Sequence, residues 1–107
     1  MDTKQALAGL SSLAQESRLA VFRLLVQVGP EGMAASKIAE RLDISPSSLS
    51  FHLKELSHAG LVTQERLGRY LIYRASFEQM NELLAYLTAN CCQGEQCLDM
   101  KAAPCKC

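Results

Sequence analysis

The sequence lacks any segment that could cross a membrane or direct secretion. No apolar run approaches the roughly 18 residues that a membrane-spanning helix needs. Residues 1–18 also lack a basic stretch followed by an apolar one, the pattern of a signal peptide. We therefore expect a soluble, cytoplasmic protein without a membrane partner. At 107 residues and 49% hydrophobic content, the chain has room for one compact domain, and so short a domain leaves apolar surface for a partner.

Cysteine is absent from the first 90 residues, and all five cysteines lie between Cys91 and Cys107. They follow every segment with a regular apolar pattern, so they cannot be disulfides that hold a core together. We interpret them as reduced thiols that await a ligand. The chain therefore divides in two: residues 1–90 are expected to fold, and residues 91–107, broken by Gly94 and Pro104, are expected to form a flexible effector-binding tail.

Net charge is also lacking, because 11 Lys and Arg residues balance 11 Asp and Glu residues. A neutral total argues against a nucleic-acid partner, since phosphate neutralisation needs clustered Lys and Arg. Residues 37–74, however, carry six basic side chains against four acidic ones, together with both histidines. Such an excess also occurs on ordinary solvated surfaces, so the pattern of the segments has to decide.

Apolar periodicity predicts three helices in the first 42 residues. Thr3 is expected to cap the first helix, whose stripe must be buried against something. The second helix starts near Glu16, stops at residues 29–32 and is expected in the core, and the third spans residues 35–42 before a tight turn. The stripe of the first helix consists of Leu7, Leu10 and Leu13.

The stretch after this turn is the most informative. Ser45 followed by Pro46 predicts a helix N-cap with proline at the first helical position, and the helix is expected to run to Ala59, with Gly60 as its stop. Its buried stripe is predicted to be Leu49, Leu53 and Leu56. Its flanking or exposed positions are Ser47, Ser48, Ser50, Phe51, His52, Lys54 and Ser57.

After Gly60 the period changes from helical to alternating. Leu61–Arg66 and Tyr70–Ala75 are predicted to be two strands joined by a turn at residues 67–69. Ser76 is then expected to cap a last helix that ends near Asn90. The stripe of this helix is Phe77, Met80, Leu83, Leu84 and Leu87.

Two helices joined by a tight turn and followed by a two-stranded hairpin predict a winged helix-turn-helix, an α+β fold that is mainly α. Such a fold places its second helix in the major groove of double-stranded DNA. The hydroxyls of Ser47, Ser48 and Ser50 suit the phosphate backbone near the positive end of the helix dipole, and His52 suits phosphates or base edges. The alternative for each serine taken singly is an ordinary residue at a helix start.

Two further side chains of this region have alternatives of their own. We expect Phe51 to be partly buried beside the leucine stripe, although an exposed ring could touch thymine methyl groups. Arg69, at the hairpin tip, is expected to reach a phosphate or a narrow minor groove, the alternative being a solvated turn residue.

At these residues the chain resembles the ArsR/SmtB family of metal-responsive repressors, over roughly residues 5–90. The segments that carry the likeness are ESRLAVFRLL, KIAERLDISPSSLSFHLKELSHAGLV and RLGRYLIYR. The resemblance implies a repressor of its own operon that forms a homodimer through the first and last helices. A two-fold dimer presents two recognition helices, so its operator should be an inverted repeat.

Members of that family differ in where their effector binds, so the site is sought in this sequence. The C-x-C motif that some relatives use at the recognition helix is missing, since no cysteine precedes Cys91. The zinc site that others use on the last helix needs histidine, and none occurs in residues 77–90. The tail therefore remains as the candidate site.

Cys91, Cys92 and Cys97 are the predicted ligands of this site. The four residues between Cys92 and Cys97 form a loop long enough to fold back, and three thiolates suit As(III) or Sb(III), which are soft and take three sulfurs in a pyramid. Cys105 and Cys107 are left as spare thiols or further donors. Sensing of zinc or cadmium and thiol-redox sensing are the alternatives. Catalysis by a thiol is not expected, because a catalytic cysteine needs a nearby base and no histidine follows residue 58.

Overall fold

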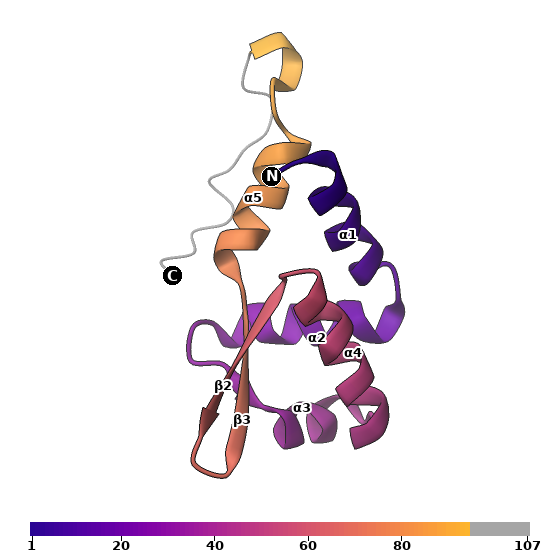
Figure 1. Ribbon diagram of the computed structural model, residues 1–107, viewed down its shortest axis with the longest axis vertical. Coiled ribbons are helices and arrows are strands. Elements are labelled where there is room, and N and C mark those ends of the chain that lie inside the picture. Colours follow the sequence, from indigo (N-terminus) through magenta and orange to yellow (C-terminus); the bar gives the residue numbers. More distant parts are fainter. Residues whose placement is uncertain (95–107) are drawn as a thin grey trace.

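The computed structural model describes residues 1–94, in which helices pack around a small sheet (Figure 1). The mainly helical winged helix-turn-helix predicted from the sequence is confirmed. In chain order the elements are α1 (Thr3–Leu13), α2 (Glu16–Val28), β1 (Met33–Ala34), α3 (Ala35–Leu42), α4 (Pro46–His58), β2 (Val62–Leu67), β3 (Tyr70–Ala75), α5 (Phe77–Leu87) and a 3-10 turn η1 (Cys91–Gly94).

The sheet contains one strand more than the expected hairpin. β2 and β3 pair antiparallel from Val62↔Ala75 to Leu67↔Tyr70, and β1 pairs with the other side of β3. A two-residue strand is too short to show alternation, so β1 could not be predicted from the apolar pattern. Gly32 brings the chain onto β3, because its φ is +75° and an added Cβ would lie 2.6 Å from Cγ of Arg74.

The core lies between α2, α3, α4 and the sheet. The predicted stripe of α4 is buried, as are Ile38 on α3 and most of the inner face of α2. Tyr73 reaches the core from β3, and desolvation by burial raises the pKa of its phenol. The side chains that are most completely enclosed are Val21, Leu25, Ile38, Leu49, Leu53, Leu56 and Leu61.

Two of the predicted helix ends were wrong. Asp2, not Thr3, caps α1, because a reciprocal capping box joins Asp2 to Gln5. The last helix ends at Leu87 rather than near Asn90, since Thr88 leaves helical geometry and its hydroxyl bonds the Leu84 carbonyl. The predicted caps at Ser45 and Ser76 are confirmed.

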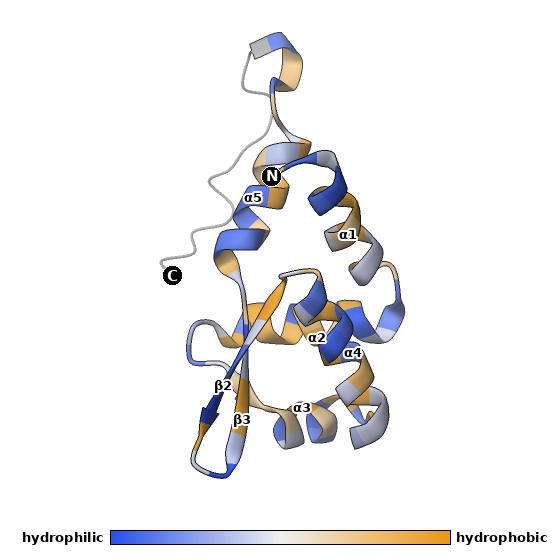
Figure 2. Cartoon of the chain, in the orientation of Figure 1, coloured by the Kyte–Doolittle hydropathy of each residue, from blue (hydrophilic) through white to orange (hydrophobic). Residues whose placement is uncertain are grey.

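The elements divide the molecule into two ends (Figure 1). The start of α4 and the hairpin tip lie at one end, while α1, the last turn of α5 and η1 lie at the other. Figure 2 shows both polar and apolar residues along α5, as expected of an amphipathic helix. Within residues 1–94, none of the helices combines the length and the apolar character that spanning a membrane requires.

Candidate DNA interface and effector site

The first turn of α4 is built as the sequence predicted. The Ser45 hydroxyl accepts a hydrogen bond from the Ser48 backbone N–H over 3.3 Å, and Pro46 occupies the first helical position. Because the leucine stripe turns inward, Ser47, Ser48 and Ser50 are exposed. Short hydroxyls beside the free N–H groups of a helix start can bind an anion such as a phosphate.

Phe51 corrects one expectation. Its side chain is 55% exposed, so the partial burial predicted from the sequence was wrong. The reason is geometric: Phe51 lies two residues, or about 200° of helix rotation, from both Leu49 and Leu53. An exposed ring on this face is placed to make apolar contacts with a ligand outside the chain.

His52 is half-buried next to Phe51. The two rings meet edge to face, with centroids 5.7 Å apart. The His52 Nδ1 atom is closed off from solvent and has no hydrogen-bond partner among the described residues. Its Nε2 atom is therefore the ring nitrogen left for an outside partner.

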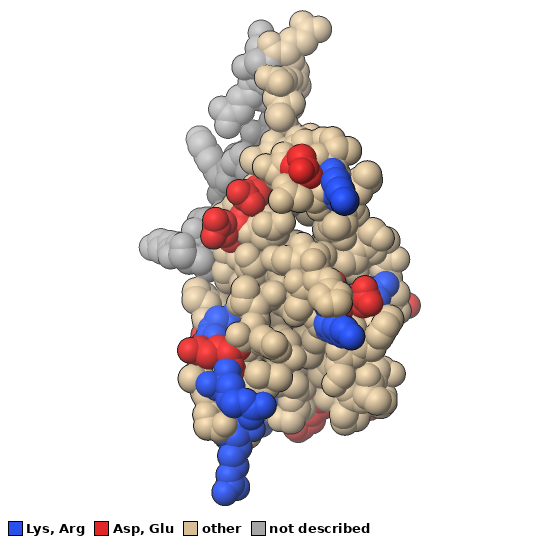
Figure 3. All heavy atoms as spheres, viewed as in Figure 1, with Lys and Arg blue, Asp and Glu red and all other residues tan. Residues whose placement is uncertain are grey.

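The wing is the hairpin of β2 and β3, and its tip is basic. Gly68, with φ of +63°, and Arg69 form the two-residue turn between paired Leu67 and Tyr70. Arg69 is exposed at the tip, where the sequence predicted it, and Arg66 is exposed on β2. Figure 3 shows Lys and Arg side chains gathered over this tip.

Arg74 is basic but serves the fold. Its guanidinium forms a 2.9 Å ion pair with Glu65 across the hairpin, and its Nε donates to the Pro30 carbonyl over 2.9 Å. The pair offsets the charge of Glu65 beside the wing. Arg66 and Arg69 are thus the arginines of the hairpin that remain for a polyanion.

Two large side chains of the wing are exposed that the sequence pattern did not mark as functional. Tyr70 is 61% exposed, and Leu67, paired with it across the hairpin, is also exposed. Leu67 was predicted to lie in the turn and Tyr70 at the start of a strand, whereas Leu67 ends β2 and both lie at the hairpin tip, beyond the core that would cover them. Their exposure beside two arginines marks them as candidate contact residues, and the sequence alone did not contain this information.

The first two predicted effector ligands are brought together. Cys91 and Cys92 follow α5 in η1, and their Sγ atoms are 3.3 Å apart. Asn90, Cys92 and Gln93 all have φ between +55° and +58°, so the chain bends sharply after α5. Cys91 is a half-buried free thiol, whereas Cys92 is exposed and disulfide-bonded, so the expectation of a reduced thiol was wrong at Cys92.

The remaining cysteines, Cys97, Cys105 and Cys107, lie outside the described residues. Within residues 1–94, no group of three or more His, Cys, Asp or Glu side chains is arranged to hold a metal ion. The predicted site therefore depends on Cys97, and two of its three ligands are placed.

A third surface is apolar. Leu7 and Leu10 of α1 and Leu84 and Leu87 of α5 are exposed, so residues 1–94 do not themselves fully cover the two predicted stripes. α1 packs within the chain through smaller residues, since Ala6, Gly9 and Ser12 are the buried ones. A groove of about 510 Å³ runs beside these leucines. Its apolar lining includes Leu10, Leu13, Leu19, Met80, Leu83, Leu84 and Leu87.

Comparisons with known proteins agree with this geometry. Residues 13–65 match the family model of a helix-turn-helix domain. The arsenical resistance operon repressor of Bacillus subtilis is 34% identical over 74 residues, 69% of each chain. The putative arsenical resistance operon repressor ArsR of Halobacterium salinarum is 36% identical over 67 residues, 63% of this chain, which spans about half of that protein's length (51%).

A solved structure is similar as well. The ArsR-like transcriptional regulator from Rhodococcus sp. RHA1 superposes with a TM-score of 0.70 at 28% identity, over 78% of this chain and 76% of that one. The residues that the family model matches contain α2, α3 and α4, and thus the helix-turn-helix described above. The chain therefore belongs to the ArsR family of helix-turn-helix transcriptional regulators.

Proposed function

We propose that this chain is an arsenite- or antimonite-responsive repressor. It binds an inverted-repeat operator as a homodimer and dissociates when As(III) or Sb(III) binds Cys91, Cys92 and Cys97. The observation that carries the proposal is the pair of sulfur atoms 3.3 Å apart directly after α5, the helix with the exposed leucines. A thiol site in that position can act on the dimer contact without approaching the DNA.

The DNA-binding part of the proposal uses one end of the molecule. Ser47 and Ser48 contact phosphates, while Ser50, Phe51 and His52 reach base edges in the major groove. Arg69 adds a contact from the wing to the backbone or minor groove. The start of α4 and the wing tip lie at the same end of the chain, which supports their use on one duplex (Figure 1).

The homodimer is supported by the apolar surface. Leu10 of α1 and Leu84 and Leu87 of α5 expose large side chains along a groove, and Leu7 of α1 is exposed as well. Hydration of so large an apolar patch is unfavourable for a monomer in water. A second copy presents the same patch, so the contact satisfies two-fold symmetry. Two recognition helices related by this axis then fit half-sites about 34 Å apart.

The effector is argued from its donor set. As(III) and Sb(III) are soft centres that suit three thiolates, and relatives named arsenical resistance repressors support this class of effector. Zinc prefers four ligands, and its usual partner histidine is absent after residue 58. Since Cys92 is disulfide-bonded, the site requires the reduced protein.

Release follows from the position of the site. Binding of three thiols to one ion rearranges the already bent chain after Asn90 and shifts the end of α5. The two recognition helices fit successive major grooves at one separation only, so altered packing of α5 in the dimer disfavours the DNA-bound state.

The decisive experiment is operator binding by the reduced full-length protein with and without arsenite, followed by fluorescence anisotropy. Arsenite should weaken binding by roughly 5-fold to 150-fold, the usual range of allosteric coupling. Cys91→Ser, Cys92→Ser and Cys97→Ser should each bind the operator normally and lose the arsenite response. The matched control, a double Cys105→Ser, Cys107→Ser variant, should respond like the wild type.

A thiol-redox repressor is the second candidate, and the disulfide at Cys92 is the observation that favours it. Parallel titrations with peroxide and with zinc separate the cases. Release by peroxide or zinc but not by arsenite would replace the arsenic proposal with the corresponding alternative. Loss of the response in the Cys105, Cys107 double variant, with retention in Cys97→Ser, would overturn the ligand assignment.

A further inference from the structure

A hydrogen bond joins α1 and α5 near the cysteines. The hydroxyls of Thr3, in the first turn of α1, and Tyr86, in the last turn of α5, bond each other across 83 residues of sequence. The turn that carries Thr3 is held by the capping box, in which Gln5 N–H donates to Asp2 over 2.7 Å. Tyr86 is therefore attached to a stiff part of α1.

Tyr86 also connects to the cysteine segment through the backbone. The Ala89 N–H donates to the Tyr86 carbonyl over 3.3 Å, and the Cys91 N–H donates to the Thr88 carbonyl over 3.0 Å. The Thr88 hydroxyl donates to the Leu84 carbonyl over 2.8 Å. A movement of Cys91 therefore acts first on the last turn of α5, the turn that carries Tyr86.

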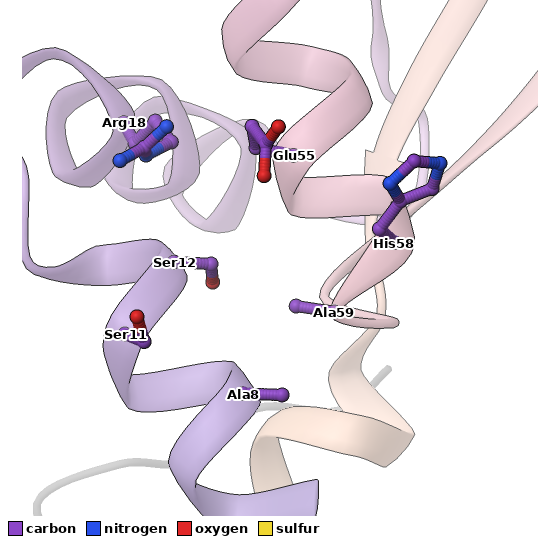
Figure 4. Close-up of a pocket in the computed structure, with 7 residues that line it drawn as sticks. All are labelled: Ala8, Ser11, Ser12, Arg18, Glu55, His58 and Ala59. Atoms are coloured by element: carbon purple, nitrogen blue, oxygen red, sulfur yellow. The ribbon is translucent and has the colours of Figure 1, made fainter.

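The other half of α1 borders the recognition helix. Ala8, Ser11 and Ser12 line a cleft of about 210 Å³, opposite residues at the end of α4 (Figure 4). The α4 and α2 residues of this cleft are Glu55, His58, Ala59 and Arg18. α1 has 11 residues, so it is about 16 Å long and spans the distance from the sensor end to this cleft.

Among residues 1–94, no side-chain hydrogen bond or ion pair connects the two sides of this cleft. Arg18 Nε is buried without a partner, and no hydrogen bond or ion pair of the Arg18, Glu55 or His58 side chains occurs among residues 1–94. Opposite charges thus face one cleft without pairing. A contact of this kind can shift without breaking a bond, unlike the Thr3–Tyr86 end of the same helix.

We infer that Thr3 and Tyr86 are positioning residues that transmit effector binding at the cysteines to α1, and through α1 to the end of α4. The inference rests on the proposed function and adds an intrachain route to the change in dimer packing. When the segment after Asn90 rearranges, Tyr86 moves with the last turn of α5, and the Thr3 hydroxyl carries α1 along. α1 then shifts against α4 at the open cleft, and the recognition helix changes its inclination to the DNA.

The test uses two variants that each remove one hydroxyl, Tyr86→Phe and Thr3→Val, in the reduced full-length protein. Operator binding is measured by anisotropy with and without arsenite, and arsenite occupancy by protection of the thiols from a chromogenic thiol reagent. In both variants binding without arsenite should change less than about twofold, and thiol protection should persist. The arsenite-induced loss of affinity should fall at least threefold below that of the wild type.

Three controls separate this coupling from a structural role. Thr3→Ser keeps the hydroxyl and should restore the response, and Thr63→Val, the same chemical change on exposed β2, should leave it intact. The double Thr3→Val, Tyr86→Phe variant should be no worse than either single variant, because the two hydroxyls form one bond. A thermal midpoint that falls while the arsenite response stays at the wild-type level would mark the bond as merely structural.

The outcomes also distinguish the inference from the function on which it rests. A wild type that responds to arsenite together with a Tyr86→Phe variant that responds equally overturns the inference and leaves the proposed function standing. A wild type that does not respond overturns both.

Discussion

α4 and α5 are two amphipathic helices with similar leucine stripes, but the chain buries the two stripes to different extents. The stripe of α4 is enclosed by the chain itself, with Leu53 only 1% exposed. The stripe of α5 is enclosed at Leu83 but opens toward its end, where Leu87 is 54% exposed. A stripe in the sequence thus predicts which face of a helix needs cover, but not whether the cover comes from the same chain.

The free faces of the two helices teach the complementary lesson. The solvent-facing side of α4 carries hydroxyls, an imidazole and one exposed aromatic ring, whereas that of α5 carries leucines. The first surface suits a polyanion with base edges, and the second suits a copy of itself. The proposed division of labour follows from this contrast, and each of the following predictions tests one side of it.

The largest effect is expected from truncating each stripe. Leu53→Ala should lower the free energy of unfolding by about 2–5 kcal/mol at every protein concentration, because it leaves a cavity in the chain's own core. Leu87→Ala should cost less, and its cost should depend on concentration, because in the proposed dimer a second copy covers this side chain. Urea denaturation at several concentrations measures both.

The companion variant Leu84→Glu, Leu87→Glu should convert the dimer to a folded monomer in sedimentation velocity. A dimer that persists in this variant would show that the exposed end of α5 is not the contact. Equal, concentration-independent losses for Leu53→Ala and Leu87→Ala would remove the distinction between the helices.

The same contrast explains what the sequence could and could not predict. The segments were predictable because caps, stops and periodicity are local: Ser45, Gly60 and Ser76 act within a few residues. Apart from the two helix ends, at Asp2 and Leu87, the failures are non-local. Phe51 was assigned to partial burial from its neighbours, while its exposure depends on which face α2 and α3 cover, and β1 exists only because β3 is there to pair with it.

The candidate site divides along the same line. The serines, His52 and Arg69 were placed on the surfaces that the sequence indicated, since their positions follow from helix rotation and a two-residue turn. Two features were not predictable. The structural role of Arg74 depends on its ion pair with Glu65 on the neighbouring strand, and the exposure of Tyr70 depends on how far the wing extends past the core.

A smaller effect is expected from the DNA-facing surface. Arg69→Ala should weaken binding to operator and random DNA alike and reduce the slope of log affinity against log salt by about 1, because it removes one phosphate contact. His52→Ala and Ser50→Ala should weaken the operator more than random DNA, by about 1–3 kcal/mol for a lost base contact. Anisotropy titrations across a salt series measure both quantities.

Arg23→Ala, which removes an exposed arginine of α2, is the matched control and should leave the salt slope unchanged. If all three DNA-facing variants lost the same affinity on operator and random DNA, the division between backbone and base contacts would be wrong. An unchanged salt slope for Arg69→Ala would return that side chain to the status of a solvated turn residue.

The smallest changes in stability, and the finest test of the comparison, concern the two N-caps. Asp2 caps α1 and Ser45 caps α4 by the same chemistry, a side-chain oxygen that accepts a hydrogen bond from the backbone N–H three positions on. Replacement of either by alanine should cost about 1 kcal/mol of unfolding free energy. Asp2→Ser and Ser45→Asp exchange one good cap for another, so both variants should unfold within about 0.5 kcal/mol of the wild type.

The effects of these two variants on DNA binding should differ, because Ser45→Asp adds a negative charge where the proposed interface meets phosphates, whereas Asp2→Ser changes a charge at the sensor end. We therefore expect Ser45→Asp to weaken operator binding while Ser45→Asn, an equally good neutral cap, preserves it. Wild-type affinity in Ser45→Asp would mean that the start of α4 does not face the DNA backbone.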